Sequence, residues 1–383
     1  MQDLRHTSAI YAKCVKMIPE WRTSATGTLM DLQAAFLLMS AAAERLDYDL
    51  CWVMCQEIYQ YATTLNLHIL DDQSSSANTD PHEHDIKRKL VWHVIKYESL
   101  IALSLRRPTN LLFSNFHVGL PLLTSDLPVD TITPFVLRSE ITFIVSRFLR
   151  LIQSSNHTGP EGHYMLETER CCQQLEALLF KWNHYEILPD TSGLGFILDY
   201  LTFGHTSLLF MDRITYEESP PSDRALYAAR KSLQIIRLAA KSRPQNPLTI
   251  LACVSPPHTP SVGLIVALSS RMISLYPFEA FFTLHCDLAS KDKHTIAEDR
   301  ALLEDFATIL HYIVPAIGAV APLAHAVDYI NIITRELESD GSPINWLYSA
   351  PSQRNAFVKR PDPAALSHLG DALNMAIDVL GKS

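Results

Sequence analysis

The fold is decided by residues 28–65, TLMDLQAAFLLMSAAAERLDYDLCWVMCQEIYQYATTL. Both halves of this stretch place apolar residues three and four positions apart, the spacing of one helix face. The two faces are Leu29, Leu32, Phe36, Met39 and Ala43, and then Cys51, Met54, Ile58, Tyr61 and Leu65. Between them, Asp47 or Asp49 offers a short acidic side chain that can begin the second helix. The stretch therefore predicts a helical hairpin.

Similar patterns recur along the rest of the chain, separated by Pro, Gly and Ser clusters. They predict helices at residues 85–105, 132–152, 163–187, 194–211, 222–240, 262–275, 299–314, 323–337 and 364–380. No alternation of apolar and polar residues of strand length stands out. We therefore expect an all-α fold, a single domain over residues 1–383 built as a compact multi-helix array of helical hairpins. The polar stretch 71–81 is expected to be a mobile loop.

Composition narrows the class of protein. Apolar residues make up 48% of the chain, charged residues 19%, and only 12 of the 383 residues are Gly, which is typical of a helical protein with a large core. The net charge of −9 argues against a surface that neutralises many phosphates, so no direct DNA binding is expected. The first residues lack the layout of a signal peptide and no apolar run reaches the ~20 residues of a membrane span, so we expect an intracellular, soluble protein without membrane contact.

Most motifs of enzyme and metal sites are missing from the sequence. There is no phosphate-binding glycine loop, no Ser between glycines and no pair of histidines flanking a Glu at one-turn spacing. The cluster from His82 to Asp85 is interpreted as a solvated helix start. The cysteines lack framework spacing and are expected to be reduced core thiols, Cys51 and Cys55 included. We expect no metal, no cofactor and no assignable catalytic residue.

One group of residues has the chemistry of a ligand site. Trp92, His93, Lys96 and Tyr97 lie close together on the helix predicted for 85–105, and they could line a pocket with one base and one cation. The alternative is packing: Trp92 and Lys96 are one turn apart, so the lysine stem can lie along the indole.

Three stretches together resemble the middle homology region of fungal zinc-cluster transcription factors. The first, residues 32–39, 51–62 and 65–68, is similar to the helix pair of that family. The second, residues 87–98 and 103–108, resembles its Trp-bearing helix closed by an Arg-Pro pair. The third, residues 275–284 with 298–299 and 302–303, resembles a later segment. The structural signature comprises Trp92, Arg107, Pro108, Tyr276, Pro277 and Phe278, and the resemblance spans residues 28–335.

The resemblance implies an all-helical domain in the nucleus that modulates transcription through protein partners or a small ligand. In that family a separate six-cysteine zinc cluster binds DNA. The sequence here departs from the pattern, because it holds no Cys-x-x-Cys pair and no basic stretch before the domain. In the signature, Arg107-Pro108 ends a helix and Trp92 packs that helix against the hairpin.

Three functions stay open on this basis. The first is a transcription-regulatory domain without its own DNA-binding cluster, acting through a partner or a small molecule. The second is a helical domain of the same family redeployed as a cytoplasmic binder or enzyme, acting on a hydrophobic metabolite in a fungal biosynthetic pathway of secondary metabolism. The third is a structural interaction module.

Overall fold

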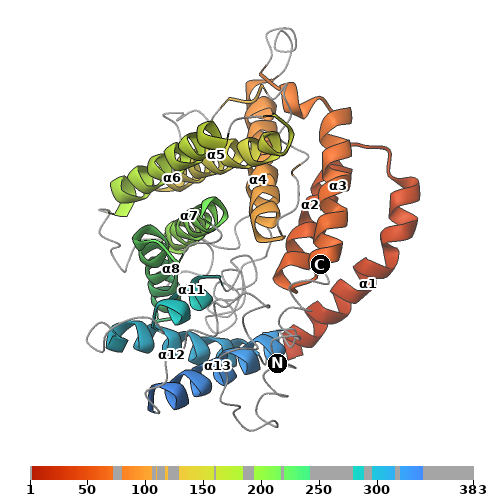
Figure 1. Ribbon diagram of the computed structural model, residues 1–383. Coiled ribbons are helices and arrows are strands. Elements are labelled where there is room, and N and C mark those ends of the chain that lie inside the picture. The colour runs from red at the N-terminus through yellow and green to blue at the C-terminus, as the bar shows by residue number, and fades with distance from the viewer. Residues whose placement is uncertain are drawn as a thin grey trace.

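The computed structural model of the chain describes residues 2–71, 80–105, 109, 117–119, 129–158, 161–183, 194–216, 220–241, 279–288, 296–314 and 320–339. These residues form eleven α-helices and a short 3-10 helix, and they contain no strand. Figure 1 shows the helices stacked against one another as an irregular array. The all-α fold and the multi-helix array predicted from the sequence are confirmed.

The predicted hairpin consists of α2 (Leu29–Glu44) and α3 (Tyr48–Thr64), which pack against each other. Thr28 and Asp31 cap the start of α2 reciprocally: the Thr28 hydroxyl accepts from the Asp31 amide, and the Asp31 carboxylate accepts from the Thr28 amide. Asp47 begins α3 by accepting from the amide of Leu50, as expected. The short helix η1 (Leu67–Ile69) follows and turns the chain towards α4 (Pro81–Leu105).

The middle of the chain surrounds one buried helix. α7 (Leu194–Thr215) packs against α4, α5 (Val129–Thr158), α6 (Glu161–Asn183) and α8 (Asp223–Lys241). Every residue from 201 to 212 is buried, so this helix has no solvent-facing side along that stretch. Figure 1 shows α7 beneath α5 and α6 and beside α8. The core of the molecule is therefore centred on α7.

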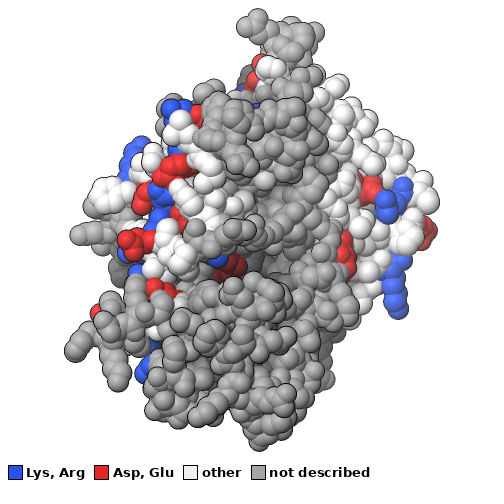
Figure 2. Space-filling model, viewed as in Figure 1, with Lys and Arg blue, Asp and Glu red and all other residues white. Residues whose placement is uncertain are grey.

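Ion pairs join the last part of the array. Ser222 caps α8 as predicted, because its hydroxyl accepts from the amide of Ala225. Arg230 of α8 then binds Asp287 of α11 (Glu279–Leu288) and Asp299 of α12 (Ile296–Ile313). α13 (Ala321–Ser339) packs against α12. Figure 2 shows acidic and basic side chains next to one another on the left of the molecule, over α6 and α8, so charge on this face is largely paired.

The first helix, α1 (Gln2–Ser24), is absent from the helices predicted above. Among its described side chains only Ile18 is buried, and Pro19 lies inside it, so it has neither a strong apolar stripe nor an uninterrupted helical sequence. Contacts with the hairpin hold it: Tyr11 donates to Asp47 at 2.9 Å, and Arg22 pairs with Glu57. Figure 1 shows α1 leaning outward from α2 and α3.

Four cysteines match the expectation of core thiols, whereas Cys286 is free but only partly buried and Cys14 is exposed. Cys51, Cys55, Cys171 and Cys172 are buried and free. Cys14 is free but exposed, and it belongs to α1, which buries few of its side chains and which the sequence pattern did not predict. Cys253 lies outside the described residues, as do the helices predicted at 262–275 and 364–380 and residues 72–79 of the predicted loop.

Candidate functional site

The four predicted ligand residues all lie on α4, but they face two different neighbours. Trp92 is buried, and its indole N–H donates to the carbonyl oxygen of Gly119 at 2.8 Å. Asp71, just after η1, accepts from the Gly119 amide and pairs with Arg88 of α4. Trp92 therefore anchors residues 117–119 to α4 and belongs to this packing arrangement rather than to a group with the other three.

His93, Lys96 and Tyr97 meet side chains from α2, α5 and α7. Arg138 of α5 donates through Nη2 to Nε2 of His93 at 2.6 Å. The Lys96 ammonium lies 5.3 Å from the ring centres of both Tyr200 and Phe203 on α7. These contacts define a basic-aromatic cluster, which we take to comprise His93, Lys96, Tyr97, Arg138, Tyr200 and Phe203.

Rings enclose the two cations of this cluster. Lys96 lies over the Tyr97 ring at 5.7 Å, and the guanidinium of Arg138 lies 5.4 Å from the centre of Tyr200. Phe36 of α2 closes another side, with its ring edge-to-face against Tyr97 at 5.3 Å. Cation–π contacts of this kind are worth about 2 kcal/mol or more when they are shielded from water. They offset part of the cost of burying the two charges.

Electrostatics in the cluster favour a neutral imidazole. Lys96 is 3% exposed and Arg138 is 4% exposed. Burial lowers the pKa of His93 well below its usual value, and the charges of Arg138 and Lys96 lower it further. Because a guanidinium only donates, Nε2 of His93 accepts and the proton of the neutral ring sits on Nδ1. At neutral pH the cluster thus presents two cations beside an uncharged base.

This arrangement can attract an acidic group. His93 is not placed to accept a proton, because its Nε2 lone pair already accepts from Arg138. The pairing of His93 and Lys96 in one environment follows the sequence prediction, whereas Arg138, Tyr200 and Phe203 were missed. The sequence does contain a hint of Arg138. This charged residue falls on the buried stripe of α5, because Ile141 and Val145 follow it at helical spacings of three and four. Tyr200 and Phe203 carry none, because aromatic residues three apart on a helix are typical of any core.

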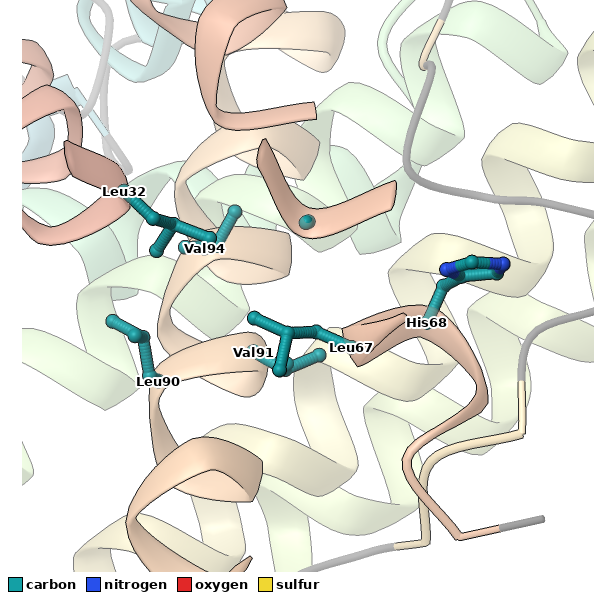
Figure 3. A pocket seen from close by; sticks show the side chains of 7 residues that line it. Leu32, Leu67, His68, Leu90, Val91 and Val94 are labelled. Atoms are coloured by element: carbon teal, nitrogen blue, oxygen red, sulfur yellow. The ribbon is translucent and has the colours of Figure 1, made fainter. Parts of the chain in front are cut away.

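A separate hollow lies on another face of α4. Its described lining is aliphatic except for one histidine, and the hollow is shallow and partly open to solvent. The lining residues are Leu32, Ala62, Leu67, His68, Leu90, Val91 and Val94. Figure 3 shows the leucine and valine side chains gathered in the middle and the His68 ring at one edge. The free space inside it is only about 10 Å³, which is room for about one water molecule and too little for an organic ligand.

The structure bears on the structural signature, on the segment from His82 to Asp85 and on metal binding to different extents. Arg107, Pro108, Tyr276, Pro277 and Phe278 of the structural signature lie outside the described residues. The segment from His82 to Asp85 does begin α4, but it is only partly solvated, since Nε2 of His84 lies 3.1 Å from the Leu70 carbonyl. Among the residues that the structure describes, no group of three or more His, Cys, Asp or Glu could hold a metal ion.

Comparisons with known proteins leave the site to be argued from its own geometry. No protein-family description, no curated protein and no solved structure matches the chain. The helices described here also include none long and apolar enough to cross a membrane.

Proposed function

We propose that this chain is a transcription-regulatory domain of the fungal zinc-cluster factor type, working in the nucleus through a protein partner or a small hydrophobic ligand. Its 383 residues contribute no DNA-binding cluster of their own, and the negative net charge opposes contact with phosphates. The observation that carries the proposal is the basic-aromatic cluster, which gathers three helices around two buried cations. The proposed family rests on the resemblance of the motifs at residues 32–68 and 87–108.

Stability alone is a poor reason for such a cluster. Taking a cation out of water costs several kcal/mol even after relaxation, and apolar side chains of similar size often serve a core equally well or better. In the binding role that we propose, an acidic group next to the cluster would contact Lys96 and Arg138 in a water-poor site. The small hydrophobic ligand of the proposal therefore carries an acidic group.

The position of the cluster suits a regulator. α4 contacts α3 on one side and both α5 and α7 on another, so it connects the hairpin to the buried centre of the molecule. A ligand that binds one arrangement of α4 better than another shifts the equilibrium between them by its difference in affinity. Binding at the cluster would in this way change the surface that α2 or α3 presents to a protein partner.

A thermal-shift screen of the purified chain tests the ligand. The panel contains aromatic and aliphatic carboxylic acids together with their methyl esters. We expect an acid to stabilise the protein and its ester not to, and we expect Lys96→Met and Arg138→Met to lose that stabilisation. Lys231→Met is the matched control, since Lys231 also lies over a ring, Tyr227, but on α8. Equal responses of the Lys96 and Lys231 variants would contradict the proposed site.

DNA binding provides the second test. The purified chain is titrated with double-stranded DNA at near-physiological salt, and we expect only weak binding without sequence preference. Sequence-selective binding that weakens steeply with salt would overturn the proposal, because the regulatory role assigned here excludes direct contact with DNA.

The enzyme hypothesis retains one supporting observation, a neutral imidazole and a buried ammonium on successive turns of α4. On that hypothesis the chain acts in the cytoplasm on a hydrophobic metabolite. The double variant His93→Ala and Lys96→Ala separates the two. A change in stability without a change in any ligand signal would eliminate an enzyme built on these residues.

A further inference from the structure

Helix α1 exposes a strip of apolar side chains that the hairpin does not cover. This outer strip consists of Ile10, Cys14 and Met17, which follow one another at spacings of four and three and lie within about 60° on the helix surface. Ile10 is 62% exposed and Met17 is 53% exposed, and Cys14 is exposed as well. Figure 1 shows α1 at the edge of the molecule, standing away from α2 and α3. The outer strip is therefore open to a neighbouring molecule.

The hairpin covers a different side of α1. Tyr11, Val15 and Ile18 face the hairpin, about 100° around the helix from the outer strip, and all three are buried or partly buried. Trp21 lies close to the outer strip and is partly buried, with its ring edge-to-face against Tyr61. The apolar surface of α1 is thus wider than the part that the hairpin covers, which is typical of a helix with a second neighbour.

Two charges of opposite sign lie along the outer edge of this strip, on the side away from the hairpin. Lys13 and Glu20 are exposed and lie within about 20° of each other around the helix, but two turns apart along it. Neither has an ionic partner within the described part of the chain. In an antiparallel pair of identical helices, each edge of one helix faces the same edge of the other, so Lys13 of each copy meets Glu20 of the other. The outer edge is therefore complementary to itself.

We propose that the outer strip of α1 is a dimer interface, on which α1 of a second copy packs antiparallel. A register centred between residues 15 and 16 sets Cys14 of each copy against Met17 of the other. At the ends of the contact, Ile10 packs on the partly exposed indole of Trp21. The same register brings the opposite charges of the outer edges together. This inference goes beyond the regulatory function proposed above and does not rest on it.

The area of this contact predicts a reversible dimer. The side chains of the strip and its edge expose about 500 Å² on each copy, so that a dimer buries about 1,000 Å², the lower end for a specific interface. Sedimentation equilibrium of the full chain, from low micromolar to several hundred micromolar concentration, should therefore show monomer and dimer with a Kd in the micromolar range. A monomer at every concentration would overturn the proposal, and so would assembly beyond the dimer, because a two-fold contact closes on itself.

Apolar variants locate the interface. Met17→Glu should weaken the dimer at least about tenfold, because it places a charge in the apolar strip of both copies. Met30→Glu is the matched control: Met30 is 72% exposed, but on α2, and its variant should dimerise like the natural chain. Both positions are exposed, and circular dichroism checks that both variants fold. Equal effects of the two changes would refute a contact through α1.

A charge exchange tests the register. Lys13→Glu and Glu20→Lys should each weaken the dimer about tenfold, since each turns two attractive pairs into two repulsive ones by symmetry. The double variant carrying both changes should dimerise nearly as well as the natural chain. A double variant as weak as the single ones would rule out the antiparallel pairing.

Cross-linking gives a measure of distance. The register leaves the two Cys14 residues about 4.5 Å apart along the helix axis, near the two-fold axis, so a short bismaleimide should join them. Cys14→Ala should lose the covalent dimer and still dimerise in the centrifuge. No cross-link at concentrations where the dimer forms, or a cross-link that persists in Cys14→Ala, would place the contact elsewhere.

Discussion

Three polar or small residues within one turn of α7 are buried and lack ordinary packing or hydrogen bonding. Gly204 has no side chain, and a Cβ there would lie 2.5 Å from Cδ2 of Leu179 on α6. His205 is buried with neither ring nitrogen hydrogen-bonded within the described part of the chain, and the same holds for the hydroxyl of Ser207. Burying a polar group without a partner costs free energy. We therefore expect a larger residue at Gly204 to destabilise the protein, and removal of an unpaired polar side chain to be neutral or stabilising.

Replacing Gly204 should destabilise the protein. Gly204→Ala places a methyl group against the buried side chains of Leu179 and Ile141, and such overpacking costs about 1–3 kcal/mol. Urea denaturation followed by circular dichroism measures the change in the free energy of unfolding. Ser207→Ala, three residues away on the same helix, should be neutral or stabilising because it removes an unpaired hydroxyl. A stable Gly204→Ala variant would mean that α6 and α7 can separate freely.

Acid should weaken the fold through His205. Burial, together with a smaller effect of the positive charge of Lys231, lowers its pKa to about 3, while an unfolded histidine titrates near 6.5. Below pH 6.5 the unfolded state therefore binds more protons, and stability is lost as the pH falls. Between pH 7 and pH 5, His205→Leu should lose about 2 kcal/mol less than the natural protein, as measured by denaturation at both values. Identical losses would show that His205 is protonated without penalty in the folded state.

At the scale of elements, α8 is joined to its neighbours by arginines of unequal burial. Arg230 faces two buried carboxylates, Asp287 of α11 and Asp299 of α12, and hydrogen bonds to Asp299 raise its pKa. Two turns later, Arg237 pairs with Asp305 of α12, and both partners are partly exposed. The same helix thus offers a buried and a surface version of one interaction.

We expect these two arginines to differ in energy. Arg230→Met removes the cation that joins two buried carboxylates, and breaking a buried network of this kind costs about 3 kcal/mol or more. Arg237→Met removes a surface pair and should cost less than about 1 kcal/mol. Thermal and urea unfolding of both variants gives the comparison. Similar losses would show that the Arg230 cluster is screened by water.

The sequence predicted these elements well where an apolar stripe and a cap coincide. Asp47 and Ser222 begin their helices as expected, because both signals act within a single turn. α1 was not predicted because it buries few apolar side chains. α5 was predicted from its apolar stripe, but the helix extends past that stripe at both ends. His93 and Lys96 could be grouped from spacing alone, but Arg138 could not be joined to them, since no local pattern indicates which face of α5 meets α4.

For the whole molecule, the contrast between α1 and α7 predicts how stability is distributed. One contiguous apolar cluster runs from Ile18 to Val327, and α7 lies inside it whereas α1 contacts its edge. Local opening is easiest where few apolar side chains are buried. Amides of α1 should exchange with solvent orders of magnitude faster than those of residues 201–212, as measured by hydrogen exchange and mass spectrometry.

A control for this difference is a variant lacking residues 2–24. It should retain cooperative unfolding, because the hairpin and α7 keep their mutual packing. Slow exchange in α1, or loss of the folded state on truncation, would mean that Ile18 and the Tyr11 and Arg22 contacts couple this helix to the core far more strongly than their exposure suggests.

The unbroken burial of residues 201–212 also limits how this chain can change in length. One residue added to an α-helix turns everything beyond it by about 100°, and one residue removed turns it back by the same amount. On a helix with a solvent-exposed face, the same rotation moves some side chains into water, where they meet no neighbour. On α7 each displaced side chain meets the wrong neighbour, so variation in length among natural forms of this protein should accumulate in the connections and leave α7 at constant length.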